Sequence, residues 1–348
     1  MIIIIYYRRN TILSSNITWY RRFGMLLIVA MLVLTVVACG SKNGEKSTEG
    51  NSNPQSTYVV TGETTNDAEQ EFKIITTVNG EIKVPTHPKR IVAEEYLGSL
   101  IALDVIPVGA PGLTLDNMYF KEALTGVVDT GAYGQMSSEQ IFELEPDLII
   151  SGIAENYEVL SKIAPTITIP YGDLKNAHEE LTYFGELLGL EQEAKDWLAN
   201  YDRIIAEAKQ KVDAAIPADA SFSIIENTAG STYAYGDNFG RGGQAVYQAL
   251  GRKPPVAIAD DIMEKQWAEI SEETLPQYAG DYIILTSNDR TLEDYKADPI
   301  WSTLPAVQNN QVFVWKEEVS WYYDPIAILK QTEQLTDWLT GLHANNNE

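Results

Sequence analysis

Hydrophobic and polar residues alternate over short distances from residue 72 onward, and the pattern predicts strands that alternate with helices. Residues 72–85 contain two strand-like runs separated by Asn79-Gly80, a pair that favours a two-residue β-hairpin turn. The apolar run at 90–93 predicts a buried strand, and residues 97–103 predict the helix that follows it. This alternation is typical of an α/β lobe with a largely parallel sheet.

The longest predicted helix of the globular part lies at residues 191–212. This segment has no Gly or Pro, and its apolar residues recur at steps of three and four, so one helix face is hydrophobic. A helix of about 20 residues is about 30 Å long. The pattern fits a helix packed in the core of either lobe, and it fits equally a stiff connector between two lobes.

Two segments of the chain, 137–150 and 271–284, repeat each other without a gap at an offset of 134 residues. The matched positions include Ser137 and Ser271, Glu139 and Glu273, Asp147 and Asp281, and two pairs of Ile. Each copy predicts a capped short helix, a turn and a buried strand. We therefore expect two similar α/β lobes.

The N-terminal region has the pattern of a secretory signal. Residues 23–38 form a 16-residue uncharged stretch after Arg21 and Arg22, which is shorter than the roughly 20 residues of a membrane-spanning helix. The stretch ends in residues 36–40, which resemble a bacterial lipobox. That resemblance implies cleavage before Cys39 and attachment of diacylglycerol to its sulfur, the alternative being an uncleaved anchor with an incidental cysteine.

The segment after Cys39 is rich in Gly, Ser, Thr, Asn and Glu, and it has too little apolar surface to order itself, so we expect a flexible tether. The expected organisation is a signal peptide at 1–38, the tether at 39–71, an N-terminal lobe at 72–190, a connecting helix at 191–213 and a C-terminal lobe at 214–348.

Composition excludes several function classes. The chain of 348 residues has 49 acidic and 25 basic side chains, a formal charge of −24, which argues against nucleic acid as a partner. One cysteine and three well-separated histidines do not favour a zinc or iron–sulfur site. The adjacent Glu94 and Glu95 are typical of a solvated loop rather than of a metal site. No G-x-S-x-G motif marks a hydrolase nucleophile, so catalysis is not expected.

From about residue 72 to the C-terminus, the chain resembles the iron-siderophore type of substrate-binding lipoproteins of ABC importers. The segments that carry the likeness, in the family's order, are the lipobox and residues 84–112, 137–150, the connector helix, 238–251, 270–287 and 299–315. The resemblance implies two similar α/β lobes joined by one long α-helix, with a ligand cleft between the lobes. It also implies a monomer, lipid-anchored at the outer face of the cytoplasmic membrane, that delivers a ferric siderophore to permease subunits driven by a cytoplasmic ATPase.

Members of that family dock on their permease through one acidic residue on each lobe, and those positions match Glu139 and Glu273. Two carboxylates on equivalent helices would orient the protein on arginine pockets of a two-subunit partner. The alternative is that each glutamate only complements the N-terminal dipole of its own helix.

Candidate ligand residues are those that follow the carboxyl ends of strands, where loops of α/β lobes converge. They are Tyr96, Tyr119, Gln135, Tyr235, Arg241, Trp267, Trp315, Trp321 and Tyr322. Any single aromatic among them is as readily a core residue as a ligand contact. Arg241 stands in the Gly-rich turn 240–243 before an apolar helix, which favours an anion or carbonyl site, the alternative being a solvent-exposed arginine.

The ligand's charge follows from this one clear arginine. A ferric tris-catecholate carries about three negative charges and would need several cationic partners when buried. A ferric hydroxamate is near neutral and suits aromatic walls with a few donors. We therefore expect a hydroxamate or citrate–hydroxamate ligand, with iron present only as part of it and no resident cofactor. The open alternatives are cobalamin or haem on the same fold, and a membrane-tethered hydrolase.

Overall fold

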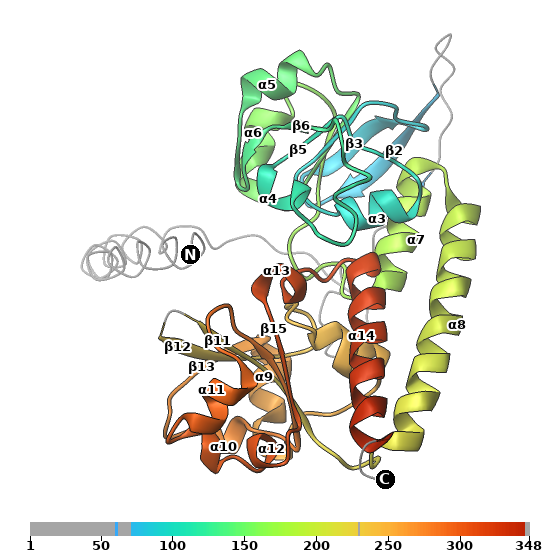
Figure 1. Ribbon diagram of the computed structural model, residues 1–348. Helices are drawn as coiled ribbons and strands as arrows, with labels where there is room; N and C mark the ends of the chain where they lie inside the picture. Colours follow the sequence, from blue (N-terminus) through green and yellow to red (C-terminus); the bar gives the residue numbers. More distant parts are fainter. Residues whose placement is uncertain (1–59, 62–70, 229, 345–348) are drawn as a thin grey trace, which may run out of the picture. The chain divides into compact units, whose positions relative to one another are not determined.

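The computed structural model describes residues 60–61, 71–228 and 230–344 (Figure 1). The predicted signal peptide, Cys39 and most of the predicted tether lie outside these residues. Val60–Thr61 (β1) pairs antiparallel with β2 (Phe72–Thr77). No helix of the described residues is long and apolar enough to cross a membrane.

The N-terminal β-hairpin forms as predicted, with its turn one residue earlier. Strand β2 pairs with β3 (Gly80–Pro85) in a register that places Thr77 opposite Gly80. The two loop residues are therefore Val78 and Asn79 instead of Asn79 and Gly80. The Thr77 hydroxyl accepts a hydrogen bond from the Asn79 N–H at 3.1 Å, which closes the shifted turn.

The first lobe is built on a five-stranded, wholly parallel sheet in the order β10-β9-β4-β5-β6. Its strands are β4 (Ile91–Ala93), β5 (Gly109–Ala110), β6 (Val128–Asp129), β9 (Leu148–Ser151) and β10 (Thr166–Thr168). Its helices are α3 (Leu97–Ala102), α4 (Gly112–Leu115), α5 (Ser138–Glu143), η1 (Ala154–Asn156), α6 (Tyr157–Leu160) and α7 (Ala177–Leu188). A small ribbon joins β7 (Gly131–Ala132) to β8 (Gln135–Met136).

The second lobe has a mixed sheet in the order β13-β12-β11-β14-β15, in which β11, β14 and β15 are parallel and β12 and β13 antiparallel. Its strands are β11 (Phe222–Thr228), β12 (Ser231–Tyr235), β13 (Trp267–Ile270), β14 (Tyr282–Thr286) and β15 (Val312–Trp315). Its short helices are η2 (Gln244–Ala249), η3 (Val256–Ile258), α9 (Ala259–Lys265), α10 (Leu275–Tyr278), α11 (Leu292–Ala297), η4 (Trp301–Thr303), α12 (Pro305–Gln308) and α13 (Glu317–Ser320).

Both sheets are covered on both faces, as buried parallel strands require. In β4, Ile91 packs into the core that contains Leu100 of α3, whereas the next residue, Val92, packs with Ile141 of α5. Neighbouring residues of β11 divide in the same way between two cores of the second lobe. The near-continuous apolar runs in these strands follow from this double burial.

The repeat has a structural basis in one aspartate per lobe. Asp147, just before β9, accepts the backbone N–H groups of Lys89 and Arg90 at 2.8 and 2.9 Å. Asp281, just before β14, accepts the N–H of Ser221 at 2.7 Å. Each carboxylate thus holds the entry to the neighbouring parallel strand. The predicted helix after Ser271 is shorter than its counterpart, because residues 272–274 form a turn and α10 begins at Leu275.

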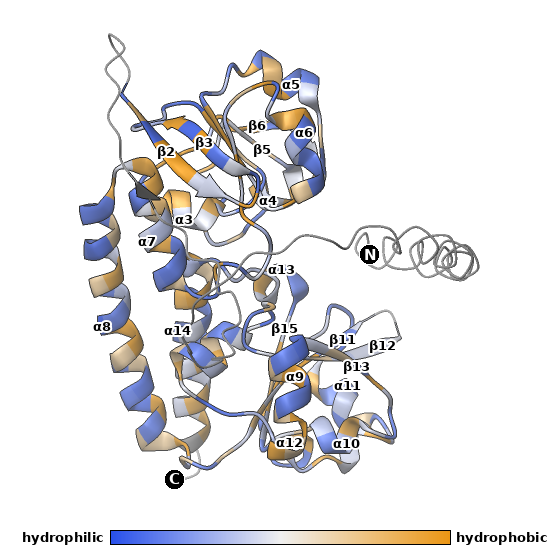
Figure 2. Cartoon of the chain, turned by 180° about the vertical axis from the view of Figure 1, so that it is seen from behind, coloured by the Kyte–Doolittle hydropathy of each residue, from blue (hydrophilic) through white to orange (hydrophobic). Residues whose placement is uncertain are grey.

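The predicted connector forms as α8 (Glu191–Ala215), and a second long helix, α14 (Pro325–Ala344), packs along it (Figure 1). Figure 2 shows hydrophilic and hydrophobic positions mixed along α8, as expected of a helix with one packed face. Helix α14 contributes to both lobes. Its Ile326 packs against the first-lobe core, whereas Leu335 and Leu339 lie in the second.

Candidate ligand-binding site

The Gly-rich turn at 240–243 fixes the backbone of Arg241 between two tryptophans. A Cβ on Gly240 would overlap the carbonyl oxygen of Trp321, and one on Gly242 would lie 2.6 Å from the Trp315 ring. Arg241 itself has a positive φ of 56°. Only glycine fits on either side of this arginine, which is why the turn has this sequence.

The Arg241 side chain is buried among aromatic rings, so the solvent-exposed alternative is wrong: the residue is 7% exposed. Its guanidinium carbon lies 4.1 Å from the centre of the Trp321 ring and 4.9 Å from that of Tyr235. Its Nε donates to Glu226 Oε2 at 2.8 Å, and the Tyr235 hydroxyl donates to the same oxygen at 2.7 Å. Within the described part of the chain, the two Nη groups have no hydrogen-bond partner and remain available as donors.

Tyr171, which follows β10, brings the first lobe to this aromatic cluster. Its ring meets Phe239 edge-on at 5.5 Å and Tyr323 at 6.1 Å, and its hydroxyl donates to the carbonyl oxygen of Asn238. The residue is nevertheless 46% exposed. Sequence reasoning missed Tyr171, although its position two residues after the β-branched run at 166–169 was a usable signal.

Two glutamates end the central strand β4 of the first lobe, and they are not in a solvated loop. Glu94 is fully buried and accepts hydrogen bonds from the Ser151 hydroxyl, the Gly134 N–H at 3.0 Å and the Asn156 amide at 3.2 Å. Glu95 accepts a hydrogen bond from the Tyr133 hydroxyl. Burial raises the pKa of both carboxyl groups, that of Glu95 to about 6. The described residues contain no cluster of three side chains able to hold a metal ion.

The model of a family described as periplasmic binding protein matches residues 91–319, about two thirds of the chain. The chain belongs to this periplasmic binding protein family. Among curated relatives of this family member, the iron(3+)-hydroxamate-binding protein YxeB of Bacillus subtilis is 36% identical over 321 residues, covering 90% of this chain and 96% of the relative. The iron(3+)-hydroxamate-binding protein FhuD of the same organism is 32% identical over 329 residues, covering 92% and 98%.

Solved structures agree with the predicted family. The FhuD protein from S. pseudintermedius aligns with a TM-score of 0.69 at 32% identity, covering 77% of this periplasmic binding protein and 98% of that chain. FhuD2 from Staphylococcus aureus with bound ferrioxamine B aligns with a TM-score of 0.66 at 27% identity, covering 74% and 100%. The expected fold class, two α/β lobes with one long helix, is confirmed.

The structure separates the remaining predicted ligand residues of this family member into three kinds. Tyr119 and Tyr322 donate from their hydroxyls to the carbonyl oxygens of Val319 and Leu113, and so tie the first lobe to the segment before α14. Trp315 is 6% exposed and bonds Thr286 in the core, so it acts mainly by packing.

The last three predicted ligand residues are Tyr96, Gln135 and Trp267. Tyr96 is partly buried against Phe184, with ring centres 5.2 Å apart. Gln135 is exposed on the β7–β8 ribbon, and Trp267 is 36% exposed on the edge strand β13 beside Tyr233. Ligand contact by any of the nine residues stays a prediction.

Glu139 and Glu273 occupy equivalent exposed positions on the two lobes of the binding protein. Glu139 lies in the first turn of α5, whose N-cap Ser137 accepts the Gln140 N–H at 3.3 Å. Glu273 lies in the turn before α10, where Ser271 accepts the Thr274 N–H at 3.2 Å. Capped turns therefore present both side chains to solvent, and docking through them stays a prediction.

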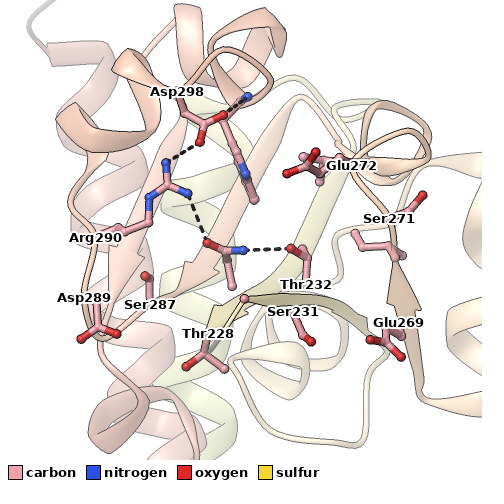
Figure 3. A pocket seen from close by; sticks show the side chains of 15 residues that line it. Thr228, Ser231, Thr232, Glu269, Ser271, Glu272, Ser287, Asp289, Arg290 and Asp298 are labelled. Carbon is pink, nitrogen blue, oxygen red and sulfur yellow. Dashed lines mark hydrogen bonds and ion pairs between the residues drawn. The ribbon is translucent and has the colours of Figure 1, made fainter.

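A polar cavity of about 510 Å³ lies beside this second turn, lined in part by Ser271 and Glu272 (Figure 3). Its arginine, Arg290, pairs with Asp298 at 2.9 Å and lies 3.9 Å from the centre of the Tyr295 ring, so its charge is already compensated. None of the nine predicted ligand residues lines this cavity. The candidate ligand site is therefore the aromatic cluster around Arg241.

Proposed function

We propose that this protein captures a ferric hydroxamate or citrate–hydroxamate siderophore outside the cytoplasm and delivers it to the permease of an ABC importer. The observation that carries the proposal is the buried Arg241 guanidinium, which has aromatic rings around it and two Nη groups without hydrogen-bond partners in the described chain. Those groups can donate to the oxygens of a ferric hydroxamate. The names of the relatives YxeB and FhuD support this ligand class.

The charge of the site favours a ligand that is close to neutral. Glu226 compensates Arg241 within the cluster, so a ferric tris-catecholate with about three negative charges would enter without matching cations. Tyr235 and Trp321 instead offer apolar ring surface. Iron enters only as part of the ligand, and capture and release need no covalent bond to be made or broken.

The anchor and the partners complete the proposal. Diacylglycerol on Cys39 would hold a monomer at the outer face of the cytoplasmic membrane, since lipid chains anchor a protein without spanning the bilayer. Glu139 and Glu273 would bind arginines of the two transmembrane subunits, which work with a cytoplasmic ATPase. Their matching exposed positions on the two lobes support this assignment.

Intrinsic tryptophan fluorescence tests the ligand class, because Trp321 lies against Arg241. The full chain in detergent solution is titrated with a ferric hydroxamate, a ferric catecholate, haem, cobalamin and free ferric iron. We expect saturable quenching by the hydroxamate and none by free iron. The proposal would be refuted if only haem or cobalamin bound saturably, or if none of the compounds bound.

A further inference from the structure

Glu95 lies at the carboxyl end of the first lobe's central strand, on the edge of the sheet where ligands approach. A Cβ on Gly152, which follows β9, would overlap the Glu95 carboxylate, so glycine leaves the space that this side chain fills. The Tyr133 hydroxyl, from the β7–β8 turn, donates to Glu95 Oε1. Two loops thus hold the carboxylate in one place.

Glu94 and Glu95 are adjacent, but only Glu94 is fully satisfied. Three donors surround the Glu94 carboxylate, and the residue has no exposed surface. Glu95 keeps some exposed surface and has Tyr133 as its one hydrogen-bond donor, and within residues 71–228 and 230–344 no cation pairs with it. A carboxylate has about four acceptor positions, so Glu95 can accept further donors.

Tyr171 connects Glu95 to the Arg241 cluster. Burial raises the pKa of the Tyr171 phenol, the Arg241 guanidinium lowers it and the Glu95 carboxylate raises it, so both charges act on the same side chain. Glu226 already compensates Arg241, so the negative charge near Tyr171 comes from Glu95 and, to a smaller extent, from Asp237. The second lobe thus contributes free N–H donors at Arg241, and the first lobe contributes a carboxylate with open acceptor positions at Glu95.

We propose that Glu95 makes the site selective for ferric hydroxamates that carry a free ammonium group. The Arg241 Nη groups bind hydroxamate oxygens, while the Glu95 carboxylate accepts a hydrogen bond from the ammonium. A charge-assisted bond of this kind is stronger than a neutral one, and the same carboxylate repels anionic siderophores. This specificity rests on the proposed function, because it concerns which ligand of that class the site prefers.

A series of three ligands with the same ferric trihydroxamate tests the proposal. Ferrioxamine B carries a terminal ammonium, its N-acetyl derivative is neutral there, and its N-succinyl derivative carries a carboxylate. We expect the full chain in detergent to bind the ammonium form about tenfold more tightly than the acetyl form. The succinyl form should bind more weakly still. The readout is the dissociation constant from tryptophan quenching.

Glu95→Gln keeps the shape of the side chain and removes its charge. The variant should bind all three ligands with similar affinity and should match the wild type on the acetyl form, which also shows that it is folded. Glu158→Gln removes an exposed charge on α6 of the same lobe and should keep the wild-type preference. Should Glu95→Gln lack a cooperative melting transition, the wild-type series decides alone.

The outcomes separate the two proposals. Equal binding of the three ligands by the wild type, or an unchanged preference in Glu95→Gln, overturns the role of Glu95 and leaves hydroxamate capture intact. Binding of none of the three ligands overturns the proposed function and the selectivity with it.

Discussion

The Asn117 side chain donates from Nδ2 to Asp324 Oδ2 across 2.9 Å, and so joins the loop after α4 to the start of α14. The other oxygen of Asp324 accepts the N–H groups of Ile326 and Ala327 at 3.1 and 3.0 Å. One carboxylate thus caps α14 and links it to the first lobe.

Replacing Asp324 by Ala should lower the free energy of unfolding by about 1–2 kcal/mol at pH 5, because the helix cap and the bond to Asn117 are both lost. The loss should be smaller at pH 7.5, since burial raises the pKa of this carboxyl from 3.8 to about 6 and its ionisation weakens folding. Urea unfolding of the full chain in detergent, followed by circular dichroism, measures the change. Asp337→Ala, on an exposed position of the same helix, is the control and should have little effect. An unchanged midpoint for Asp324→Ala would mean that neither bond contributes net stability.

Stability should fall as pH rises from about 4.5 to about 8 because of Glu180. This residue is 4% exposed, and burial raises its pKa from an ordinary 4.5 to about 8. Between these values the folded state keeps a proton that the unfolded state has lost, so folding binds a proton and weakens with increasing pH.

Glu180→Gln should therefore be more stable than the wild type at pH 8.5, by on the order of 2–4 kcal/mol, and should show a flatter dependence between pH 5 and 8.5. Urea midpoints at the two pH values measure this. Glu193→Gln, exposed on α8, provides the matched control. A wild type whose stability rises over this range would contradict the assignment.

Because Arg241 and Glu226 form a buried ion pair, removing one partner and removing both should affect stability differently. Arg241→Gln leaves a buried carboxylate uncompensated and should cost about 3–5 kcal/mol of stability. Arg241→Gln combined with Glu226→Gln should recover most of that loss but still bind a ferric hydroxamate about 10–100-fold more weakly, since the Nη donors are gone. Thermal melts and fluorescence titrations measure the two effects. Wild-type affinity in the double variant would show that Arg241 does not contact the ligand.

Glu139→Ala and Glu273→Ala should leave ligand affinity unchanged and abolish siderophore-dependent iron uptake by cells. Both side chains are exposed on the surfaces of their lobes, so their loss should affect docking alone. Glu143 and Glu264 are also exposed, and cells that carry the control variants Glu143→Ala or Glu264→Ala should take up iron normally. A loss of affinity in the first two variants would place these glutamates in the ligand site.

Cys39→Ser should remove the membrane anchor, because the serine hydroxyl cannot form the thioether to diacylglycerol. Mass spectrometry of the mature N-terminus and partition between detergent and water measure the outcome. The wild type should enter the detergent phase and the variant should be recovered without lipid. A lipid-free wild type would mean that the lipobox is incidental.

Local patterns predicted the hairpin, the connector helix and the repeat, because each depends on neighbours in sequence. The shift of the hairpin turn to Val78 and Asn79 shows how far such reasoning reaches, since register is decided by pairing along the whole ribbon. The burial of Glu94 needed donors from the β7–β8 turn, from the end of β9 and from η1. No local pattern contains that information.

The candidate site was predicted in part. The Gly-rich turn singled out Arg241, but its burial depends on Trp321, which is 80 residues away along the chain. Tyr171 was missed because its role arises from contact with residues of the other lobe. Trp315 was predicted because it follows the carboxyl end of a strand; it is 6% exposed and donates to Thr286, and its contact with a ligand stays a prediction.

The pairing of α8 with α14 has a mechanical consequence. A single helix can twist about its own axis, whereas two packed helices resist torsion because their interlocked side chains would have to slide past one another. Ile326 of α14 packs against the first-lobe core and Leu335 lies in the second-lobe core, so α14 connects the two lobes as a second rigid helix beside α8. The protein should therefore bind and release its ligand through small bending motions of this helix pair. The radius of gyration in solution should change little when the siderophore binds.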